Sequence, residues 1–146
     1  MTFTVELLAI EPHATYRETV YDQLVEVEFV DGTSLWLFDP DVTVSEDAIG
    51  EEAVIEIRTL FDESDVTGAD DRSHGIDPET DERTKGHEYY GHITERVDDD
   101  GTERFVLDVG VGELSIPTTG EVGETFDVGD DVRLSAIRSD LYDVVA

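Results

Sequence analysis

The sequence predicts an all-β protein made of two small antiparallel barrels in tandem. Apolar and polar residues alternate with the period of a β-strand in many short stretches, as in Phe105, Leu107 and Val109. Gly and Asp turns separate these stretches, and no long helical pattern lies between them. The order of strand, hairpin, acidic glycine turn and closing strand also recurs at an offset of about 80 residues.

The first predicted barrel covers residues 1–61. The apolar alternation continues on both sides of the Asp31-Gly32 turn, which is typical of a β-hairpin. Pro40 ends this hairpin, because proline cannot donate a hydrogen bond to a sheet. The elements expected in this barrel are strands at 2–10 and 52–60 and a hairpin at 24–38.

Residues 12–23 admit two interpretations. Thr15 followed by Glu18 fits a capping box, and Tyr16 and Val20 then share a helical face, so a loop or a short helix is expected. The content of Thr, Val and Tyr also suits an extended ribbon. The sequence leaves helix and strand open here.

The alternation stops from residue 62 to residue 86, where charged and turn-forming residues dominate. Such a stretch buries too little apolar surface to offset the entropy of ordering it, so an acidic flexible linker is predicted. The second predicted barrel covers residues 87–146. A new strand begins near His87, the segment 98–101 turns, and the strands and turns described above follow.

The two predicted barrels match each other in several places. Val25-Val27-Phe29 aligns with Phe105-Leu107-Val109, Leu35-Leu37 aligns with Leu114-Ile116, and Ile57-Arg58 aligns with Ile137-Arg138. Short strands at close spacing without intervening helices favour barrels of the OB or SH3-like kind. An internal duplication is therefore the simplest interpretation.

Three segments of the second half suggest a family. They are Tyr90-Gly91-His92-Ile93, the hairpin end Leu114-Ser115-Ile116, and the run Val128-Gly129-Asp130-Asp131-Val132-Arg133-Leu134. With these segments, Gly91 to Val145 resembles the TOBE and Mop-type small barrels, and Ile137 to Leu141 resembles the closing segment of TOBE modules. The resemblance implies an OB-like barrel and an oxyanion ligand, although the Ser-Ala-Arg-Asn opening of molybdate-binding Mop proteins is missing here.

The charge of the chain indicates its solvent more than its partner. The chain has 38 acidic and 9 basic residues, with a formal net charge of −29, and the acids are spread over every segment. At about 1 M salt the screening length is roughly 3 Å, so self-repulsion among such charges is weak. This composition resembles that of cytoplasmic proteins of halophilic archaea. The N-terminal stretch reads as a first strand and not as a signal peptide, and no apolar run is long enough to span a bilayer, so we expect a cytoplasmic protein without membrane contact.

The predicted hairpin is apolar on both faces at its return strand. Leu35 and Leu37 face one side, and Trp36 and Phe38 face the other. A strand that is apolar on both faces is covered on both. We therefore predict Trp36 and Phe38 as interface or partner-binding residues, covered by the other barrel, a second subunit or a ligand.

The residue patterns do not predict a metal, a cofactor or catalysis. His87 and His92 are five residues apart, so on a strand they point to opposite faces, while His13 and His74 lie in turn-like, solvated contexts. The chain has no cysteine and no nucleophile or phosphate-loop motif.

These observations favour a non-enzymatic binding or assembly module, with a protein partner or self-association. One alternative is a small-ligand or oxyanion binder of the tandem Mop type, which requires Arg58, Arg138 or backbone amides around one pocket. The other is a single-stranded nucleic-acid-binding OB-like protein, which the scattered basic residues disfavour.

Overall fold

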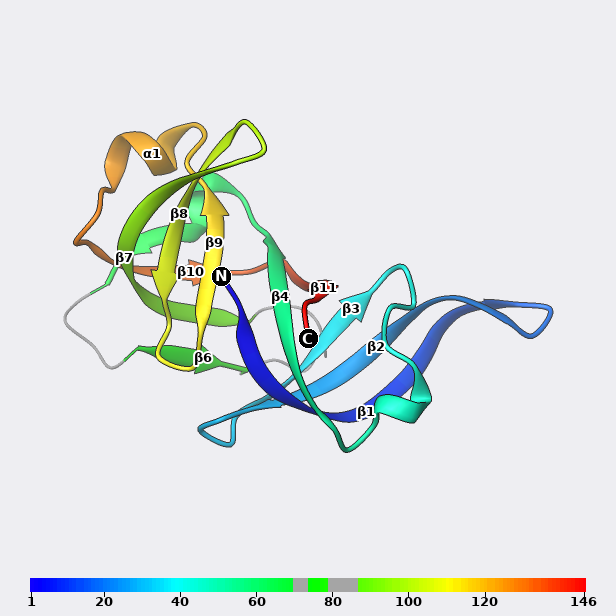
Figure 1. The fold of residues 1–146 in the computed structure, drawn as a ribbon. Helices are drawn as coiled ribbons and strands as arrows, with labels where there is room; N and C mark the ends of the chain where they lie inside the picture. The colour runs from blue at the N-terminus through cyan, green and yellow to red at the C-terminus, as the bar shows by residue number, and fades with distance from the viewer. Residues whose placement is uncertain (70–73, 79–86) are drawn as a thin grey trace.

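The computed structural model describes residues 1–69, 74–78 and 87–146. The described chain is mostly β-structure, as predicted, and forms a closed barrel beside an open sheet (Figure 1). The strands are β1 (Phe3–Tyr16), β2 (Thr19–Phe29), β3 (Ser34–Asp39), β4 (Glu52–Leu60), β5 (Val66–Gly68), β6 (Gly75–Asp77), β7 (Glu88–Asp99), β8 (Thr102–Asp108), β9 (Glu113–Pro117), β10 (Asp131–Ser135) and β11 (Arg138–Val144). The helical elements are the 3-10 turns η1 (Glu46–Ala48) and η2 (Glu63–Asp65) and the short helix α1 (Glu121–Thr125).

Five strands close the barrel in the order β1-β2-β3-β11-β4. One small barrel is therefore confirmed. Its pairing is mixed and not wholly antiparallel as predicted, because β11 runs parallel to β3. Alternate side chains point inward along each strand, so Val25, Val27 and Phe29 are buried while Glu26 and Glu28 lie on the outer face.

The prediction of a second barrel is wrong. The second sheet has the order β5-β10-β7-β8-β9, with β6 also paired to β7, and it is open. The position beside β10 is taken by β5, whose three residues pair with β10 and, in the described part of the chain, reach no further strand. Among the residues that the structure describes, no strand connects β10 to β9, so this sheet stays open.

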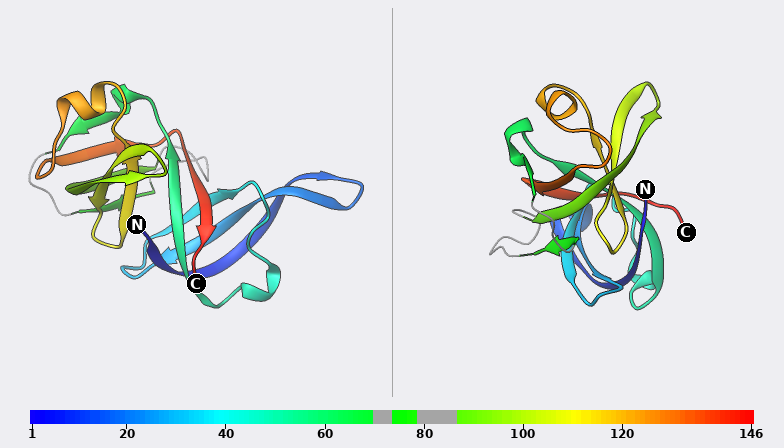
Figure 2. Two further views of the ribbon diagram at one scale, coloured as in Figure 1. Left: turned by 45° about the horizontal axis from the view of Figure 1, so that its top comes forward. Right: turned by 90° about the vertical axis from the view of Figure 1, so that its left-hand side faces the viewer.

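Four strands nevertheless keep the same relative order in both sheets. The barrel contains the order β4-β1-β2-β3, and the open sheet contains β10-β7-β8-β9. The fifth strands are exchanged between the halves of the chain. β5 follows β4 in sequence but pairs in the open sheet, whereas β11 follows β10 in sequence but lies beside β4 in the barrel (Figure 2).

The stretch predicted as a linker contains two of the short strands. β5 pairs with β10, and β6 pairs with β7. The rest of the predicted linker, 70–73 and 79–86, lies outside the described residues.

The expectation of a loop or short helix at 12–23 is wrong, and the extended alternative holds. β1 and β2 continue as a hairpin that projects from the barrel (Figure 1). Arg17 and Glu18 form its turn with φ values of 49° and 68°, the left-handed backbone of a two-residue hairpin turn. Such turns favour Asn and Gly, so the sequence Arg-Glu gave no turn signal.

The barrel and the open sheet share one continuous apolar core. β4 of the barrel packs against β9 of the open sheet, and a backbone bridge joins Phe3 to Gly112. Phe3 is 1% exposed and packs edge-on against Phe29, at 5.4 Å between ring centroids. The two sheets are therefore joined both by this backbone bridge and by their shared apolar core.

We expect Gly112→Ala to destabilise this junction. A Cβ at Gly112 would lie 2.4 Å from Cδ1 of Phe3 and 2.8 Å from the Thr2 carbonyl oxygen, so Phe3 would have to move. Overpacking of this kind costs about 1–3 kcal/mol of unfolding free energy. Denaturant titration in molar KCl measures the loss. The matched change Gly75→Ala, where a Cβ meets no atom within 4 Å, should have a much smaller effect; equal losses would contradict the packing argument.

Candidate functional site

The residues predicted to bind lie together on the outer face of the barrel. In the order β3-β11-β4, Asp140 of β11 is the register partner of both Phe38 on β3 and Arg58 on β4. Arg138 precedes Asp140 by two residues, so it shares the same face of β11. We call this surface the arginine–aromatic face; its residues are Trp36, Phe38, Arg58, Arg138 and Tyr142.

Guanidinium groups and aromatic rings alternate across this face. The Cζ atom of Arg138 lies 4.7 Å from the centroid of the Phe38 ring, and Cζ of Arg58 lies 4.3 Å from that of Tyr142. Both distances are within the range of cation–π attraction. Tyr142 is 61% exposed, so the outer surface of this layer is accessible to a partner.

Carboxylates already neutralise both arginines. Nε of Arg58 donates to Glu56 at 2.7 Å, and its Nη2 donates to Asp99 at 2.9 Å. Arg138 makes a two-pronged contact with Asp140, at 2.7 and 3.0 Å. The pKa of Arg138 is raised by its hydrogen bond to Asp140. Burial alone would lower the pKa of Arg58, but the hydrogen bonds to Glu56 and Asp99 raise it overall.

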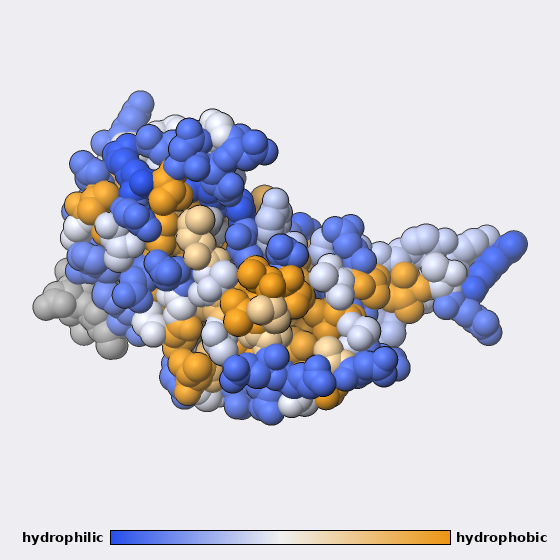
Figure 3. Space-filling view, viewed as in Figure 1, coloured by the Kyte–Doolittle hydropathy of each residue, from blue (hydrophilic) through white to orange (hydrophobic). Residues whose placement is uncertain are grey.

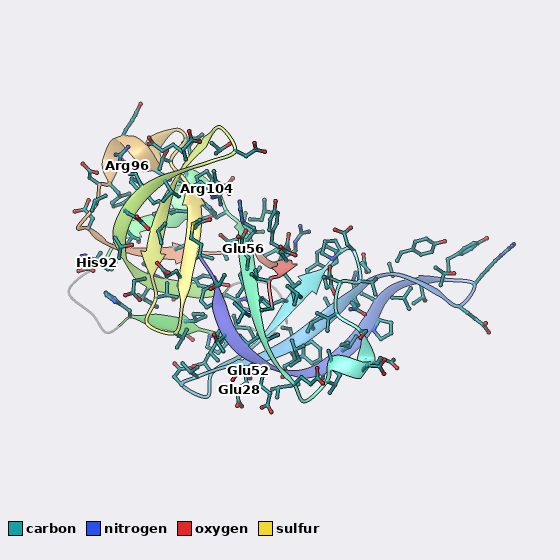
Figure 4. The ribbon with its side chains drawn as sticks, in the orientation of Figure 1. Glu28, Glu52, Glu56, His92, Arg96 and Arg104 are labelled. Carbon is teal, nitrogen blue, oxygen red and sulfur yellow. The ribbon has the colours of Figure 1, made fainter. Side chains whose placement is uncertain are left out.

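A third arginine lies close to this face. Arg104 of β8 donates to the hydroxyl and the carbonyl oxygen of Ser115, both at 2.9 Å. Burial, and then the charge of Arg58, lower the pKa of Arg104. Figure 4 shows Glu56 and Arg104 on the side where the barrel meets the open sheet, and His92 farther away on the open sheet. Figure 3 shows apolar surface over the barrel in this view, whereas the surface near α1 is mainly hydrophilic.

Side chains of the barrel itself cover part of Phe38. The His13 ring from the β1–β2 hairpin contacts it edge-on at 6.2 Å between centroids, and Arg138 lies over it. Trp36 and Phe38 are both partly exposed, while their neighbours Leu35 and Leu37 are buried in the barrel. The predicted role of Trp36 and Phe38 in binding a partner stays a prediction.

Arg58 and Arg138 line neither of two surface pockets found among the described residues. One pocket of about 660 Å³ lies between β4, η2 and α1, and its lining residues are Thr59, Leu60, Phe61, Asp62, Glu63, Ser64, Pro117, Thr119, Glu121 and Val122. The other, of about 590 Å³, is lined by Thr4, Val5, Glu6, Glu28, Phe29, Val30, Asp31, Gly32, Gly50 and Glu52. Both linings contain carboxylates and no arginine, so neither pocket suits an oxyanion.

A buried polar group joins the open sheet to the barrel. The Ser139 hydroxyl on β11 lies 2.6 Å from the Tyr89 hydroxyl and 3.1 Å from Nδ1 of His87. All three residues are at most 1% exposed, and burial raises the pKa of Tyr89. Serine beside histidine resembles an activated nucleophile, but a substrate cannot reach a fully buried hydroxyl. The group fixes β7 against β11.

A second exposed cluster lies on the open sheet. Asp131 of β10 is the register partner of His92 on β7, and His74 precedes β6 on the other side of β7. Oδ1 of Asp131 lies 2.9 Å from Nδ1 of His92 and 3.3 Å from Nε2 of His74. The two imidazole rings stack with 6.0 Å between their centroids. The hydrogen bond from His92 lowers the pKa of Asp131.

Sequence reasoning did not find this cluster. The sequence pattern compares His92 only with His87, which it places on the opposite face, and it puts His74 in a solvated, turn-like segment. His74 and Asp131 are far apart in the sequence and meet only because β6 and β10 both pair with β7. The sequence shows Asp131 only as part of the acidic run before Val132, and such a run carries no information about which strands pair beside it.

The comparisons with known proteins assign no family. No protein-family model matches this chain, and no curated protein matches it. Within the described residues, no helix has the length and apolar character needed to cross a bilayer.

Proposed function

We propose that this chain is a non-enzymatic binding module whose arginine–aromatic face docks a protein partner. Aromatic residues and arginine are enriched in the parts of protein interfaces that contribute most binding energy. Phe38 and Tyr142 each lie against a guanidinium group, so a partner would meet side chains that are already ordered. Preordered side chains lose little conformational entropy on binding. Leu60, which is 50% exposed and the register partner of Arg138, adds apolar area.

The local charge favours a protein over a phosphate backbone or a small oxyanion. Binding to nucleic acid depends on cations that neutralise phosphates and release their counterions. On this face, Arg58 and Arg138 already contact three carboxylates, those of Glu56, Asp99 and Asp140. A phosphate would have to displace a carboxylate within a chain of net charge −29. A protein partner needs no such exchange, because it can stack on the exposed rings.

A second candidate function is single-strand nucleic-acid binding by an OB-like barrel. The five-stranded barrel, with its last strand inserted between β3 and β4, is similar in architecture to OB folds. Such folds bind oligonucleotides on the face of strands 2 and 3 and at the loop between strands 1 and 2. Here Trp36 and Phe38 occupy that face, and Tyr16, which is 60% exposed, lies at the end of the β1–β2 hairpin.

The cellular location of the protein is proposed from its amino-acid composition. The uniform acidic surface supports a location in the salt-rich cytoplasm of a halophilic archaeon. Interactions among exposed charges are strongly screened there, so a partner must be recognised through apolar and stacking contacts. The exposed rings of this face fit that requirement.

A capture experiment in molar KCl tests the proposal. The full chain is immobilised on a resin and incubated with a lysate of a halophilic archaeon, with and without ribonuclease. The protein that binds is identified, purified and titrated against the chain. We expect Trp36→Ala and Arg138→Ala each to weaken its binding about tenfold or more, as for central interface residues. Val128→Ala removes apolar surface from a 49% exposed residue near β10 and should leave the affinity unchanged.

Two other outcomes would reject this assignment. Equal affinity in all three variants would show that the arginine–aromatic face is not the docking surface. Capture that disappears with ribonuclease and with Tyr16→Ala, but not with Arg138→Ala, would support the nucleic-acid candidate.

A further inference from the structure

We infer that His74, His92 and Asp131 form a binding site for a first-row divalent metal ion such as Zn²⁺. The site lies on the open sheet, apart from the arginine–aromatic face, so it is independent of the function proposed above. Each residue offers one donor atom, and these three atoms lie within 4.8 Å of one another. In the described part of the chain, no other group of three His, Asp or Glu residues meets that condition.

The distances between donor atoms fit a coordination sphere. Zn–N and Zn–O bonds of about 2.1 Å place neighbouring ligand atoms about 3.4 Å apart in a tetrahedron and about 3.0 Å apart in an octahedron. Oδ1 of Asp131 lies 2.9 Å from Nδ1 of His92 and 3.3 Å from Nε2 of His74. An ion could therefore take the place of the shared protons with small side-chain rotations.

The backbone holds the three ligands in place. Asp131 and His92 are register partners on paired strands, so their side chains leave the same face of the sheet. Gly75, the neighbour of His74, is the register partner of Tyr90 on β7. The backbone of His74 also packs closely against Gly110, where a Cβ would lie 3.3 Å from the His74 carbonyl oxygen. Ligands fixed in this way lose little entropy when an ion binds.

The surroundings of the cluster suit a cation. β8 pairs with β7 on the side away from β10, and there Asp108 is the register partner of His92. Asp108 therefore adds a carboxylate to the same face of the sheet. The side chains of His74, His92 and Asp131 are 31%, 39% and 29% exposed, so coordination positions remain open to water or to a ligand group. Three protein ligands with an open position are typical of zinc sites that bind a further molecule. Imidazole nitrogen favours zinc, nickel or copper over magnesium or calcium.

The chain contains a matched pair that lacks the third ligand. Nδ1 of His13 lies 2.9 Å from Oδ1 of Asp22, the same distance as between His92 and Asp131. In the described residues no third donor joins His13 and Asp22 within the metal-binding distance. His13 is thus an internal control for a simple histidine–carboxylate contact.

Titration with Co²⁺ and Zn²⁺ tests the site. The full chain is kept in molar KCl with excess Mg²⁺, so that isolated carboxylates are occupied. Calorimetry should give about one Zn²⁺ per chain, and Co²⁺ should develop visible d–d absorption. We expect His92→Ala and Asp131→Asn each to weaken Zn²⁺ affinity about 100-fold or more. Loss of a residue that only hydrogen-bonds to a metal ligand already weakens metal affinity about 10–100-fold. His13→Ala should leave affinity and stoichiometry unchanged.

A measurement on the unmodified protein avoids any effect of the variants on folding. Co²⁺ should broaden the imidazole NMR signals of His74 and His92 before that of His13. Binding of several ions with equal affinity, equal broadening of all three signals, or full affinity in His92→Ala would overturn the assignment. Any of these results would mean that the histidines and Asp131 form only a hydrogen-bonded contact and no metal site.

Discussion

Asp39→Ala should cause one of the largest losses of stability available from a single substitution in this protein. Asp39 ends β3 and is 0% exposed. Its Oδ1 accepts a hydrogen bond from the Thr43 amide at 2.9 Å, and its Oδ2 accepts from the Val44 amide at 3.0 Å and from Nε2 of Gln23 at 2.8 Å. Without the carboxylate, the buried Val44 amide, the partly buried Thr43 amide and one N–H of Gln23 lose their acceptor, while Gln23 keeps its bond to the Val44 carbonyl oxygen. Each unsatisfied group costs about 1–3 kcal/mol, so we expect a loss of about 3 kcal/mol or more.

Two further variants separate the hydrogen bonds from the charge of Asp39. Asp39→Asn keeps the shape but replaces one acceptor by an NH₂ group that faces other donors, so it should also destabilise. Asp41→Ala removes an exposed carboxylate two residues away and should change the unfolding free energy by less than about 0.5 kcal/mol. Denaturant titration in molar KCl, followed by circular dichroism, measures all three. Similar values for Asp39→Ala and Asp41→Ala would show that the carboxylate does not organise the loop.

Dilution of salt should unfold the protein. The formal net charge is −29, and the screening length grows from about 3 Å at 1 M salt to about 10 Å at 0.1 M. Carboxylates on neighbouring strands then repel one another across the whole surface. We expect β-sheet circular dichroism to disappear as KCl falls from about 1 M to about 0.1 M. A fold that persists at low salt would contradict the proposal of adaptation to brine.

A row of glutamates on the barrel places like charges directly opposite one another. Glu6 on β1 is the register partner of Glu28 on β2 and of Glu52 on β4, and Figure 4 shows Glu28 and Glu52 close together on the barrel. Like charges directly opposite each other destabilise a sheet. Glu6→Gln should therefore lower the KCl concentration needed for folding. Glu18→Gln removes the same charge at the hairpin turn and should shift the salt midpoint less; equal shifts would indicate that only net charge matters.

Much of the local structure could be predicted from the sequence. The hairpin around Asp31-Gly32 was visible because its turn chemistry and its alternation agree. The hairpin around Arg17-Glu18 was not, because neither residue is typical of a left-handed turn. The turn at Asp39-Pro40 was recognised as the end of a strand, but its buried carboxylate was not, since aspartate in turns is usually exposed.

Long-range pairing could not be predicted from the same patterns. Alternation shows which residues of a strand face the core, but not which strand lies beside it. Arg58 and Arg138 could be named from the sequence as a pair, yet their neutralisation by Glu56, Asp99 and Asp140 depends on the order β3-β11-β4. The contact of His74 and His92 with Asp131 depends in the same way on β6 and β10 pairing with β7.

The parallel pairing of β11 with β3 has a consequence for how the chain folds during synthesis. Phe38 pairs with Asp140, and β11 follows the other four barrel strands in the sequence, so the barrel closes only after β11 has been made. Until then, β3 and β4 expose open edges, which are sites for aggregation. In molar salt the repulsion between negatively charged chains is screened, so the acidic surface protects these open edges far less than it would in dilute buffer.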